Sequence, residues 1–600
     1  MSDTNENHEN GPARGLKRKK KRSANQMMKK LARRRNPGHG SELDTESYQY
    51  LVRILDLLRT EFPTMEDKLM FVNNVYEQTI GNEIEIAKNQ VGSRVLDSLM
   101  EYATLEVIQR LKEAFTPALR PICSDCFASH VLEKIIKTCA ERGNRKLKSQ
   151  SKDKNSISVT SDEISKYNTI ALNLSKYMIN NIEEFVYDTY ANHILRTVIN
   201  CLAGLIDKDD HQKNDKSIKT PVKIPVMQGY TDLLVDAGNR LLRWGKFPEF
   251  GKDNLTSGLL QTYLTALKDI DPKLTSSIIK KIITECFKSK SNSEDDSSII
   301  FNSDPASRLL ESCLVSSTPE MFVEVYEQLF KGKLKALSLM KPANFSVQRL
   351  IDNCPTKEDF EVIFEEISEH LTEILESHHS GVLASLANAC LRLQAKQGPF
   401  VNVISKTLHC DDSNEKQLLL VSLVSRLVTY EQFQSAKKGN RNIPLDLHGS
   451  LIVQAILNFN KPIKIVNSIF SMGGEELAGL FSDPKGSRIL DAFMDSKFVG
   501  EKSRDKLAKM LKGYWVDLAC GIHGSRCIDK IWEHSKDTQK KFIMEELASV
   551  GQKLLATKSG KLISHKLNVE LYQRSPKSWI EAQKTEVKTK ALFADVLGEQ

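Results

Sequence analysis

Apolar residues recur along most of the chain at three- and four-residue spacing, which is the spacing of one face of an α-helix. In the stretch at 342–353, PANFSVQRLIDN, a helix with 3.6 residues per turn brings Val347, Leu350 and Ile351 into one apolar stripe. No stretch shows the alternation and β-branched enrichment that is typical of a β-strand. The hydrophobic pattern therefore predicts an all-α protein.

Three side chains lie together beside this stripe. Asn344, Phe345 and Gln348 share one arc of the helix, because side chains at i and i+4 are neighbours about 5–6 Å apart at Cβ and i+1 sits to one side of them. A single set has an ordinary explanation, since amides on a solvated helix face are common and short motifs carry a high false-positive risk. A repeated set needs a different explanation.

The same arrangement occurs eleven times along the chain. Each copy has a small residue, a marker residue i that is often polar, a variable residue, two mostly apolar residues and a side chain at i+4. The markers are residues 93, 129, 192, 257, 307, 344, 381, 450, 487, 525 and 561. Six of the ten intervals are 36–38 residues long, and a fixed period of this length is the signature of a stacked helical solenoid. We call the helix that carries a marker residue the marked helix. Spacers such as 318–343 also have apolar residues at helical spacing, which predicts a first helix ahead of each marked helix.

The longer intervals have visible causes. Residues 141–164, 207–220 and 288–298 are charged and Ser-rich, which predicts disordered insertions. The stretch QLLLVSLVSRLV at 417–428 is apolar and predicts an extra helical insertion at about 411–440. The expected domains are a disordered basic arm at 1–44, a repeat array at 45–575 and a C-terminal tail at 576–600.

Composition narrows the class of protein. A chain of 600 residues is longer than one compact hydrophobic core usually covers, so several domains or an elongated repeat array are expected. No run of about eighteen apolar residues and no N-terminal signal segment is present, so we expect neither membrane association nor secretion. Eleven scattered cysteines fit reduced intracellular thiols. The CSDC stretch has no second zinc-ligand pair, so Cys123 and Cys126 are expected to be packing residues, and no metal or other cofactor is predicted.

The net charge of +8 is concentrated at one end of the chain. Residues 1–40 hold twelve Lys or Arg against three acidic residues, whereas residues 41–600 are close to neutral, at about −1. The run GLKRKKKRSANQMMKKLARRR is either a generic solvated charge run or a nuclear or nucleolar address that also tethers RNA without sequence preference. A polyanion bound by the rest of the chain must therefore meet a local basic surface.

Stacked marked helices would present a row of side-chain pairs, one pair at i and i+4 of each helix, to single-stranded RNA. Base edges can hydrogen-bond to side chains at i and i+4, and base faces can stack on an aromatic or guanidinium side chain at i+1. Suitable stacking residues follow seven of the markers, namely Arg94, His130, His193, Arg308, Phe345, Arg488 and Arg526.

On these residues the stretches resemble the second helices of Pumilio (PUF) repeats, a family that reads one base per helical repeat with two or three side chains. The resemblance implies that Asn344, Phe345 and Gln348 form a uracil-reading triplet. It implies guanine-reading pairs and adenine-type pairs at other repeats: Ser129 with Glu133 and Ser307 with Glu311 for guanine, and Ser450 with Gln454 and, more weakly, Ser257 with Gln261 for adenine.

Other repeats depart from the family pattern. Three carry Asp where the guanine pair has the longer Glu, which makes base contact doubtful: Ser93 with Asp97, Ser487 with Asp491, and Ser525 with Asp529. Two fit no simple readout and are expected to contact phosphate: Asn192 with Arg196, and Lys561 with His565. Gly381, Val382 and Ser385 offer almost nothing to a base, so that repeat is expected to skip a base or to serve structure. We expect partial specificity, with four or five informative repeats.

Eleven repeats with polar insertions and a basic arm resemble the nucleolar branch of the Pumilio family, over about residues 45–575. This resemblance implies an α-solenoid of two- or three-helix repeats that binds single-stranded pre-rRNA on its concave surface and assists or times 18S rRNA and 40S maturation. It also implies a monomer in the nucleolus with pre-40S particle proteins as partners. A sister nucleolar branch, the Puf-A type, also has eleven repeats and remains open.

Two other classes of protein fit the sequence less well. A HEAT-like or armadillo-like scaffold also has helical repeats of about forty residues, but it does not need a recurring i, i+1, i+4 polar set. An enzyme would require a catalytic motif. The chain has no GxxxxGK[ST] phosphate loop and no HExxH, and its single CxxC stretch has no second CxxC to pair with. The sequence therefore predicts a binding protein without catalysis.

Overall fold

The computed structural model describes residues 39–60, 62–144, 160–206, 222–287, 300–583 and 585. These residues are mainly helical and are joined by turns and short extended stretches. They also contain an isolated antiparallel bridge between Gly40 and Asn89 and one two-stranded antiparallel ladder, in which Leu205 of β1 (Leu205–Ile206) pairs with Lys223 of β2 (Val222–Lys223). The all-α fold class is confirmed. Residues 1–38 of the predicted arm and most of the three polar insertions lie outside the described residues, whereas residues 39–44 of the arm are described and Leu43 is buried. Of the first insertion, residues 141–143 end one helix and residues 161–164 begin the next.

The chain divides into two compact units, and the division passes through α13 (Asn254–Leu267). The first unit ends at Arg243 and also takes Gly258–Asp271. Its helices are α2 (Thr45–Leu57), α3 (Met65–Glu77), α4 (Glu83–Ala87), α5 (Gln90–Leu99), η1 (Met100–Tyr102), α6 (Leu105–Phe115), η2 (Thr116–Ala118), α7 (Leu119–Cys123), α8 (Ala128–Gly143), α9 (Ser161–Asn180), α10 (Ile182–Phe185), α11 (Thr189–Leu202) and α12 (Gln228–Arg243).

The second unit comprises Trp244–Ser257 and the chain from Pro272 onward. Its helices are η3 (Phe247–Glu249), α14 (Pro272–Lys281), η4 (Ile282–Cys286), α16 (Asp304–Ser316), α17 (Pro319–Leu329), α18 (Leu334–Leu339), α19 (Ala343–Asn353), α20 (Lys357–Ser368), α21 (Leu371–Glu376), α22 (Ser380–Arg392), α23 (Gln397–Thr407), α24 (Asn414–Gln417), α25 (Leu420–Val424), α26 (Tyr430–Lys438), α27 (Leu447–Leu457), α28 (Ile463–Ser471), α29 (Gly474–Ser482), α30 (Gly486–Asp495), α31 (Glu501–Met510), α32 (Trp515–Cys520), α33 (Ile522–His534), α34 (Asp537–Ser549), α35 (Gly551–Leu555), α36 (Lys558–Leu567) and α37 (Val569–Arg574).

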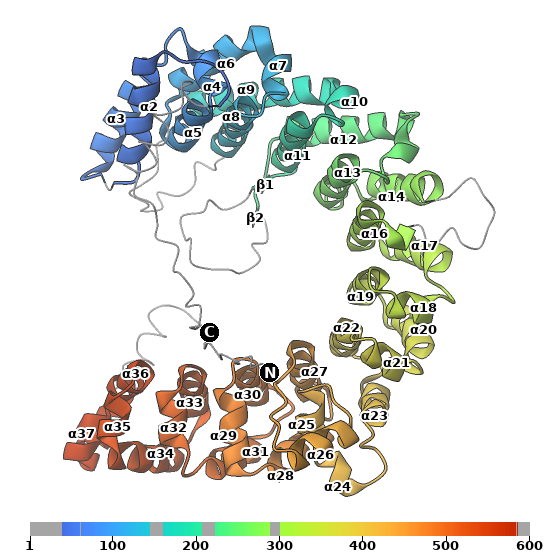
Figure 1. The fold of residues 1–600 in the computed structure, drawn as a ribbon, viewed down its shortest axis with the longest axis vertical. Coiled ribbons are helices and arrows are strands. Elements are labelled where there is room, and N and C mark those ends of the chain that lie inside the picture. The colour runs from blue at the N-terminus through green and yellow to red at the C-terminus, as the bar shows by residue number, and fades with distance from the viewer. Residues whose placement is uncertain are drawn as a thin grey trace, which may run out of the picture. The chain divides into compact units, whose positions relative to one another are not determined.

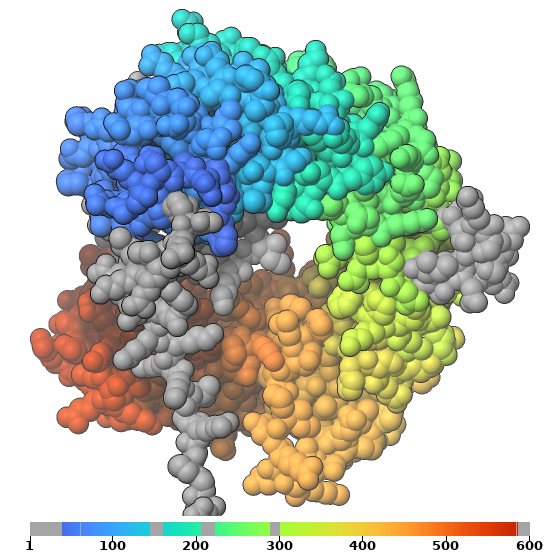
Figure 2. All heavy atoms as spheres, turned by 45° about the horizontal axis from the view of Figure 1, so that its top comes forward, coloured from blue at the N-terminus to red at the C-terminus, as the bar shows by residue number. Residues whose placement is uncertain are grey.

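Each regular repeat consists of a first helix, a short second helix and a marked helix. In the second unit the marked helices α30, α33 and α36 form one layer, the short helices α29, α32 and α35 a middle layer, and α28, α31 and α34 the opposite layer (Figure 1). Marked helices of consecutive repeats contact one another from α16 through α19, α22, α27, α30 and α33 to α36, and α5, α8 and α11 do so in the first unit. In Figure 2 the colour changes gradually from one group of atoms to the next, so segments that are close in sequence lie side by side.

Carboxylates join neighbouring repeats on the side away from the marked helices. Glu366 of α20 accepts hydrogen bonds from the backbone N–H groups of Gly332 (3.3 Å) and Leu334 (2.9 Å), at the start of α18. Glu546 of α34 does the same for Gly513 (2.7 Å) and Trp515 (2.8 Å), at the start of α32. A carboxylate is favourable at a helix N-terminus because it satisfies unpaired N–H groups and complements the helix dipole.

Both of these turns need glycine. Gly332 has φ +74° and Gly513 has φ +94°, values that a residue with a Cβ rarely adopts. The sequence KG between the first and second helix is therefore a turn signal for this repeat type, as in FKGKL and LKGYW.

Packed structure extends into the predicted insertion and the predicted tail. Helix α25 lies within the apolar stretch at 417–428 and buries Leu420, Val421, Leu423 and Val424. Residues 576–583 are helical, and the indole N–H of Trp579, whose side chain is 3% exposed, donates to the carbonyl of Leu567 at 2.9 Å. The C-terminal array thus continues past residue 575. No helix among the described residues is long and apolar enough to span a bilayer.

Candidate nucleic-acid interface

Six of the marked helices begin at a carboxylate or amide that stands four residues before the marker. Asp188 accepts from the backbone N–H groups of Tyr190 (2.9 Å) and Ala191 (2.8 Å) at the start of α11, and Asn89 caps α5 in the same way. The same position is filled by Asp125, Asp253, Asp446 and Asp483, each of which accepts backbone N–H bonds at the start of its helix. These caps fix where these six marked helices start. They were missed in the sequence, although Asp and Asn are the expected N-cap residues.

The small residue before the marker lets the marked helix approach the preceding segment. A Cβ on Gly486 would lie 1.9 Å from the carbonyl oxygen of Leu480, and one on Gly524 would lie 2.5 Å from that of Leu518. Gly92 and Gly560 meet a carbonyl six residues earlier in the same way. The glycine therefore allows close packing, and this packing fixes the position of the marker side chains relative to the preceding helix.

The three marker positions differ consistently in exposure. The residues at i+1 are exposed at all seven predicted stacking positions, and Phe345 is 59% exposed. Nine of the predicted i+4 residues are half-buried, whereas Ser385 is buried and His565 of the last repeat is exposed; the nine are Asp97, Glu133, Arg196, Gln261, Glu311, Gln348, Gln454, Asp491 and Asp529. The residues at i are half-buried at Ser525, exposed at Lys561 of the last repeat, and buried at Ser93, Ser129, Asn192, Ser257, Ser307, Asn344, Ser450 and Ser487. The structure thus brings i+1 and i+4 to one surface and holds i beneath it.

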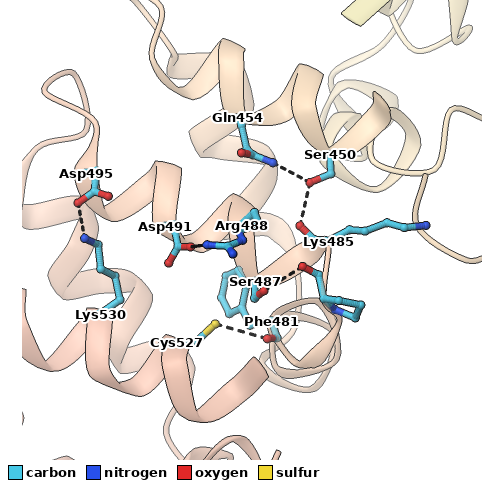
Figure 3. A network of polar contacts seen from close by, with 11 residues as sticks. Ser450, Gln454, Phe481, Lys485, Ser487, Arg488, Asp491, Asp495, Cys527 and Lys530 are labelled. Atoms are coloured by element: carbon cyan, nitrogen blue, oxygen red, sulfur yellow. Dashed lines mark hydrogen bonds and ion pairs between the residues drawn. The ribbon is translucent and has the colours of Figure 1, made fainter. Parts of the chain in front are cut away.

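Most of the i side chains have bonds to the protein. Ser450 donates to the carbonyl of Lys485 (2.8 Å), two residues before the next marker, and accepts from Gln454 Nε2 (2.9 Å), as Figure 3 shows. Ser257 donates in the same way to the carbonyl of Pro305 at 2.7 Å. The amide of Asn192 is fully buried and donates to the carbonyl of Val186 at 2.8 Å. These residues connect repeats or turns, so a base would have to compete with existing bonds.

The uracil-type triplet is also preorganised by internal bonds. Asn344, which is 3% exposed, donates through Nδ2 to the carbonyl of Lys341 at 2.5 Å. Gln348 Nε2 donates to Asn344 Oδ1 at 2.8 Å, so the two amides are linked to each other. The ring of Phe345 stands out from the surface beside them. A base stacked on Phe345 would therefore meet the amide of Gln348 before that of Asn344.

Several i+4 groups contact the next repeat at its i+5 position. Glu133 accepts a hydrogen bond from Thr197 Oγ1, Arg196 Nε donates to Thr262 Oγ1 at 3.1 Å, and Asp529 pairs with Lys566 at 2.9 Å. Glu311 lies 3.9 Å from Arg349 Nε. By contrast, Asp491 pairs within its own helix, with Arg488 at 3.2 Å (Figure 3). The i+5 residue was not singled out from the sequence, because its contact is formed only when repeats stack.

Burial affects the carboxyl groups at this surface. Burial raises the pKa of Asp97, and the positive charges of Lys134 and Lys137 partly offset this rise. Burial likewise raises the pKa of Glu311, with Arg349 acting in the opposite direction.

Two hollows lie between consecutive marked helices. The α5/α8 hollow, of about 420 Å³, is lined by Ser93, Arg94, Asp97, Cys126, Phe127, His130, Glu133, Lys134 and Lys137. The α16/α19 hollow, of about 400 Å³, is lined by Asp304, Ser307, Arg308, Glu311, Pro342, Phe345, Gln348, Arg349 and Asp352. In each hollow the predicted i, i+1 and i+4 residues of the first repeat meet the i+1 and i+4 residues of the next. A flat group between two successive i+1 side chains would face the i+4 groups edge-on.

Helix α22 corrects the sequence-based register by one residue. In α30 the buried apolar positions are i+2, i+3, i+6 and i+7, which are Ile489, Leu490, Phe493 and Met494. The same spacing in α22 gives Val382, Leu383, Leu386 and Ala387, all buried, if the marker is Ser380. The marker at 381 was therefore wrong, and Gly381 takes the i+1 position with Ala384 at i+4. The Ser-Gly pair misled the assignment, since either residue fits the small-then-marker order.

The CSDC stretch is divided between core and surface. Cys123 is fully buried with its sulfur 3.5 Å from Met178 Sδ, and burial raises the pKa of its thiol to about 12. Cys126 is half-buried and lines the α5/α8 hollow. Cys123 is a packing residue, as predicted, whereas Cys126 also contributes to the candidate interface. Within the described ranges, no group of three His, Cys, Asp or Glu side chains is arranged to hold a metal ion.

Comparisons with known proteins identify the family of the repeats and agree with the fold. A family model described as the NOP9-like PUF repeat domain matches residues 81–241 and 244–562. The chain is 25% identical over 595 residues to human Nucleolar protein 9, covering 94% of this chain and 92% of that protein. It is 24% identical to Pumilio homolog 23 of Arabidopsis thaliana, covering 93% of this chain and 75% of that one. A solved structure described as APUM23-GGAUUUGACGG matches with a TM-score of 0.69 and 23% identity, over 90% of this chain and all of that one.

Proposed function

Because the chain belongs to the NOP9-like PUF repeat domain family, we propose that it binds single-stranded RNA along its marked helices and acts in ribosome biogenesis. The RNA is a segment of pre-rRNA, held unpaired while the 18S rRNA and the 40S subunit mature. The similar APUM23 structure is described together with GGAUUUGACGG, a sequence that contains uracil, and the human relative is named for the nucleolus. Both descriptions support the proposal for this chain.

One observation carries the proposal. An exposed Arg, His or Phe stands at i+1 of seven marked helices, and a half-buried polar side chain stands one turn away at i+4 of the same helix. A protein scaffold has no need for this combination at the same position of successive repeats. Stacking faces combined with polar groups for base edges are the two components of single-strand recognition.

The roles follow from exposure. The exposed i+1 residues stack on bases, and the i+4 residues contact base edges. In two repeats the buried i residue holds i+4 in place: Asn344 accepts from Gln348 at 2.8 Å, and Ser450 accepts from Gln454 at 2.9 Å. Arg196 is committed to Thr262 through Nε, so only its remaining guanidinium N–H groups can reach RNA, in keeping with a phosphate contact.

The cellular setting is proposed on the same basis. The protein acts in the nucleolus, as a monomer, and meets proteins of the pre-40S particle. The basic arm, outside the described residues, adds affinity without sequence preference, because lysine and arginine contacts to phosphate release counterions. No catalytic step is proposed, and neither relative's name denotes an enzyme.

The experiment is a filter-binding titration of the full chain against short single-stranded RNAs at several salt concentrations. Asn344→Ala combined with Gln348→Ala should lower the preference for uracil at one RNA position by roughly 1–3 kcal/mol, the value of a good base-specific contact. Gln328→Ala is the matched control, because it removes an exposed amide from the first helix α17. Absence of salt-dependent RNA binding by the wild-type chain would refute the proposal and favour a protein scaffold.

A further inference from the structure

Two marked helices carry glycine at i+1, where the others carry a stacking or apolar side chain. They are α13, with Gly258, and α22, with Gly381. In both, the i+4 side chain of the preceding repeat lies over the glycine. A Cβ on Gly381 would stand 2.6 Å from both heteroatoms of the Gln348 amide, and one on Gly258 would stand 3.4 Å from Arg196 Nη1. The contact is closest at Gly381, where any side chain would overlap Gln348.

The Gln348 side chain is fixed in this position from two sides. Its Nε2 donates to Asn344 Oδ1 at 2.8 Å, and its amide plane lies against the bare Cα of Gly381. It therefore occupies the volume in which a stacking residue of the α22 repeat would stand. The absence of a side chain at 381 is thus part of how Gln348 is positioned.

The remaining positions of α22 present little to a nucleotide. The hydroxyl of Ser380, at i, is engaged with His448 Nδ1 at 2.9 Å. Ala384, at i+4, is 5% exposed and has no polar side-chain atom. The helix has neither a stacking face nor an edge-reading group, although it contacts α19 on one side and α27 on the other.

We propose that α22 is a spacer repeat: RNA passes it without a base contact, and Gly381 exists to seat Gln348 of the α19 repeat. This inference rests on the proposed RNA-binding function. It adds the repeat at which the correspondence of one base to one repeat is interrupted. The strand makes base contacts at the α19 repeat, carries a base with no contact across α22, and resumes contacts at the α27 repeat, where Gln454 stands at i+4.

Two substitutions separate the parts of this proposal. Gly381→Ala adds only a Cβ, which must displace the Gln348 amide without supplying a stacking group. It should weaken the base preference of the α19 repeat, roughly threefold to tenfold, with overall stability little changed. Gly381→Arg displaces Gln348 as well, but adds a guanidinium on which a base can stack. It should make the uncontacted base contribute to binding.

The test uses the full chain and a short single-stranded RNA selected by the wild-type chain from a randomised pool. Abasic sites are introduced at one position of this RNA at a time, and dissociation constants are measured. The wild type should tolerate an abasic site at one position that has sensitive positions on both sides. Gly381→Arg should make that position sensitive, whereas Gly479→Arg, an exposed glycine of α29 with no atom near its Cβ position, should not.

The outcomes are distinct. A wild-type chain that binds no RNA refutes the proposed function itself. A wild-type chain that binds RNA but loses affinity at every abasic position within the site overturns the spacer inference alone. Gly381→Ala that binds as the wild type, with base preference unchanged at every position, overturns the role of Gly381 in seating Gln348.

Discussion

The α5/α8 hollow and the α16/α19 hollow are built from the same positions of consecutive marked helices, yet they differ in chemistry. The first has three cations against two carboxylates and places His130 at i+1 of its second helix. The second has two cations against three carboxylates and places Phe345 there. The lining cations and carboxylates are Arg94, Lys134, Lys137, Asp97 and Glu133 in the first, and Arg308, Arg349, Asp304, Glu311 and Asp352 in the second.

This difference separates two ways of holding the same strand. A hollow whose lining has more cations than carboxylates gains affinity for RNA from contacts with phosphate, and it loses this affinity as the salt concentration rises. A hollow with a negative balance repels phosphate and must gain its affinity from stacking and base edges, which depend little on salt. The shared backbone geometry does not decide the binding chemistry, and the side chains at i+1, i+4 and i+5 do.

The largest effect is expected from Phe345→Ala in the α16/α19 hollow. Removing the ring deletes a stacking surface worth about 1–3 kcal/mol per base, so the dissociation constant should rise roughly 5- to 150-fold with an unchanged salt slope. Because Phe345 is 59% exposed, the fold should tolerate the change. Val362→Ala, at an exposed residue of α20, is the control for the loss of exposed apolar area. A rise below twofold would show that this hollow holds no base.

A smaller effect, of a different kind, is expected in the α5/α8 hollow. Lys134→Gln with Lys137→Gln should lower the slope of log affinity against log salt by about 1.4, since a single strand contributes about 0.7 per neutralised phosphate. At physiological salt this corresponds to about a tenfold loss of affinity, without a change in base preference. Lys331→Gln with Lys333→Gln, at exposed residues beside Gly332, is the matched control. An unchanged slope would remove the contrast between the two hollows.

Much of this arrangement could be predicted from the sequence, because it repeats. The apolar spacing and the marker period define the marked helices, and the exposed i+1 residues follow from helical geometry alone. The misplaced marker at 381 was also correctable, since the buried positions Val382 and Leu383 stand two and three residues after Ser380, as they do in the other repeats. The apolar pattern is a better guide to register than the small residue.

Contacts between repeats could not be predicted in the same way. Ser450 was expected to face a base, but its hydroxyl donates to the carbonyl of Lys485 in the next repeat. Glu546 caps a helix that starts more than thirty residues earlier in the chain. Such pairs depend on how one repeat is rotated on the next, and no local pattern in a single sequence encodes that rotation.

The i+5 residue that contacts a predicted guanine-reading Glu from the next repeat differs between the two guanine-type repeats. Thr197 donates to the carboxylate of Glu133, whereas the corresponding neighbour of Glu311 is Arg349. Thr197→Val keeps the shape but removes the hydroxyl, so Glu133 loses one constraint on its orientation. The preference for guanine at that repeat should fall by about 1 kcal/mol, the net worth of a typical hydrogen bond, or about fivefold in competition binding. Thr262→Val, which removes the partner of Arg196, is the comparison, and it should leave guanine preference unchanged. Equal effects of the two changes would contradict a specific role for Thr197.

The smallest predicted effect is on the thermal midpoint of unfolding. Replacing a buried carboxyl group by an amide should raise this midpoint in both hollows. Burial raises the pKa of Asp97 in the first hollow and of Glu311 in the second. A carboxyl whose pKa is raised on folding binds its proton more tightly in the folded state, so its charged form costs stability at neutral pH. That cost disappears as pH falls through the folded-state pKa toward the ordinary carboxyl value. Asp97→Asn and Glu311→Gln should therefore each raise the thermal midpoint at neutral pH by about 1–2 °C.

The matching measurement is thermal unfolding near pH 7.5 and again near pH 4. Each variant should gain over the wild type only at the higher pH, because at the lower pH the wild-type carboxyl is increasingly protonated and resembles the amide. Asp495→Asn is the control, since its carboxylate accepts from Lys530 at 2.7 Å and removal of the charge should give no gain (Figure 3). A gain confined to one hollow would mean that only that hollow retains a costly carboxylate for binding. Equal gains would mean that both hollows give up stability for a group that acts on RNA.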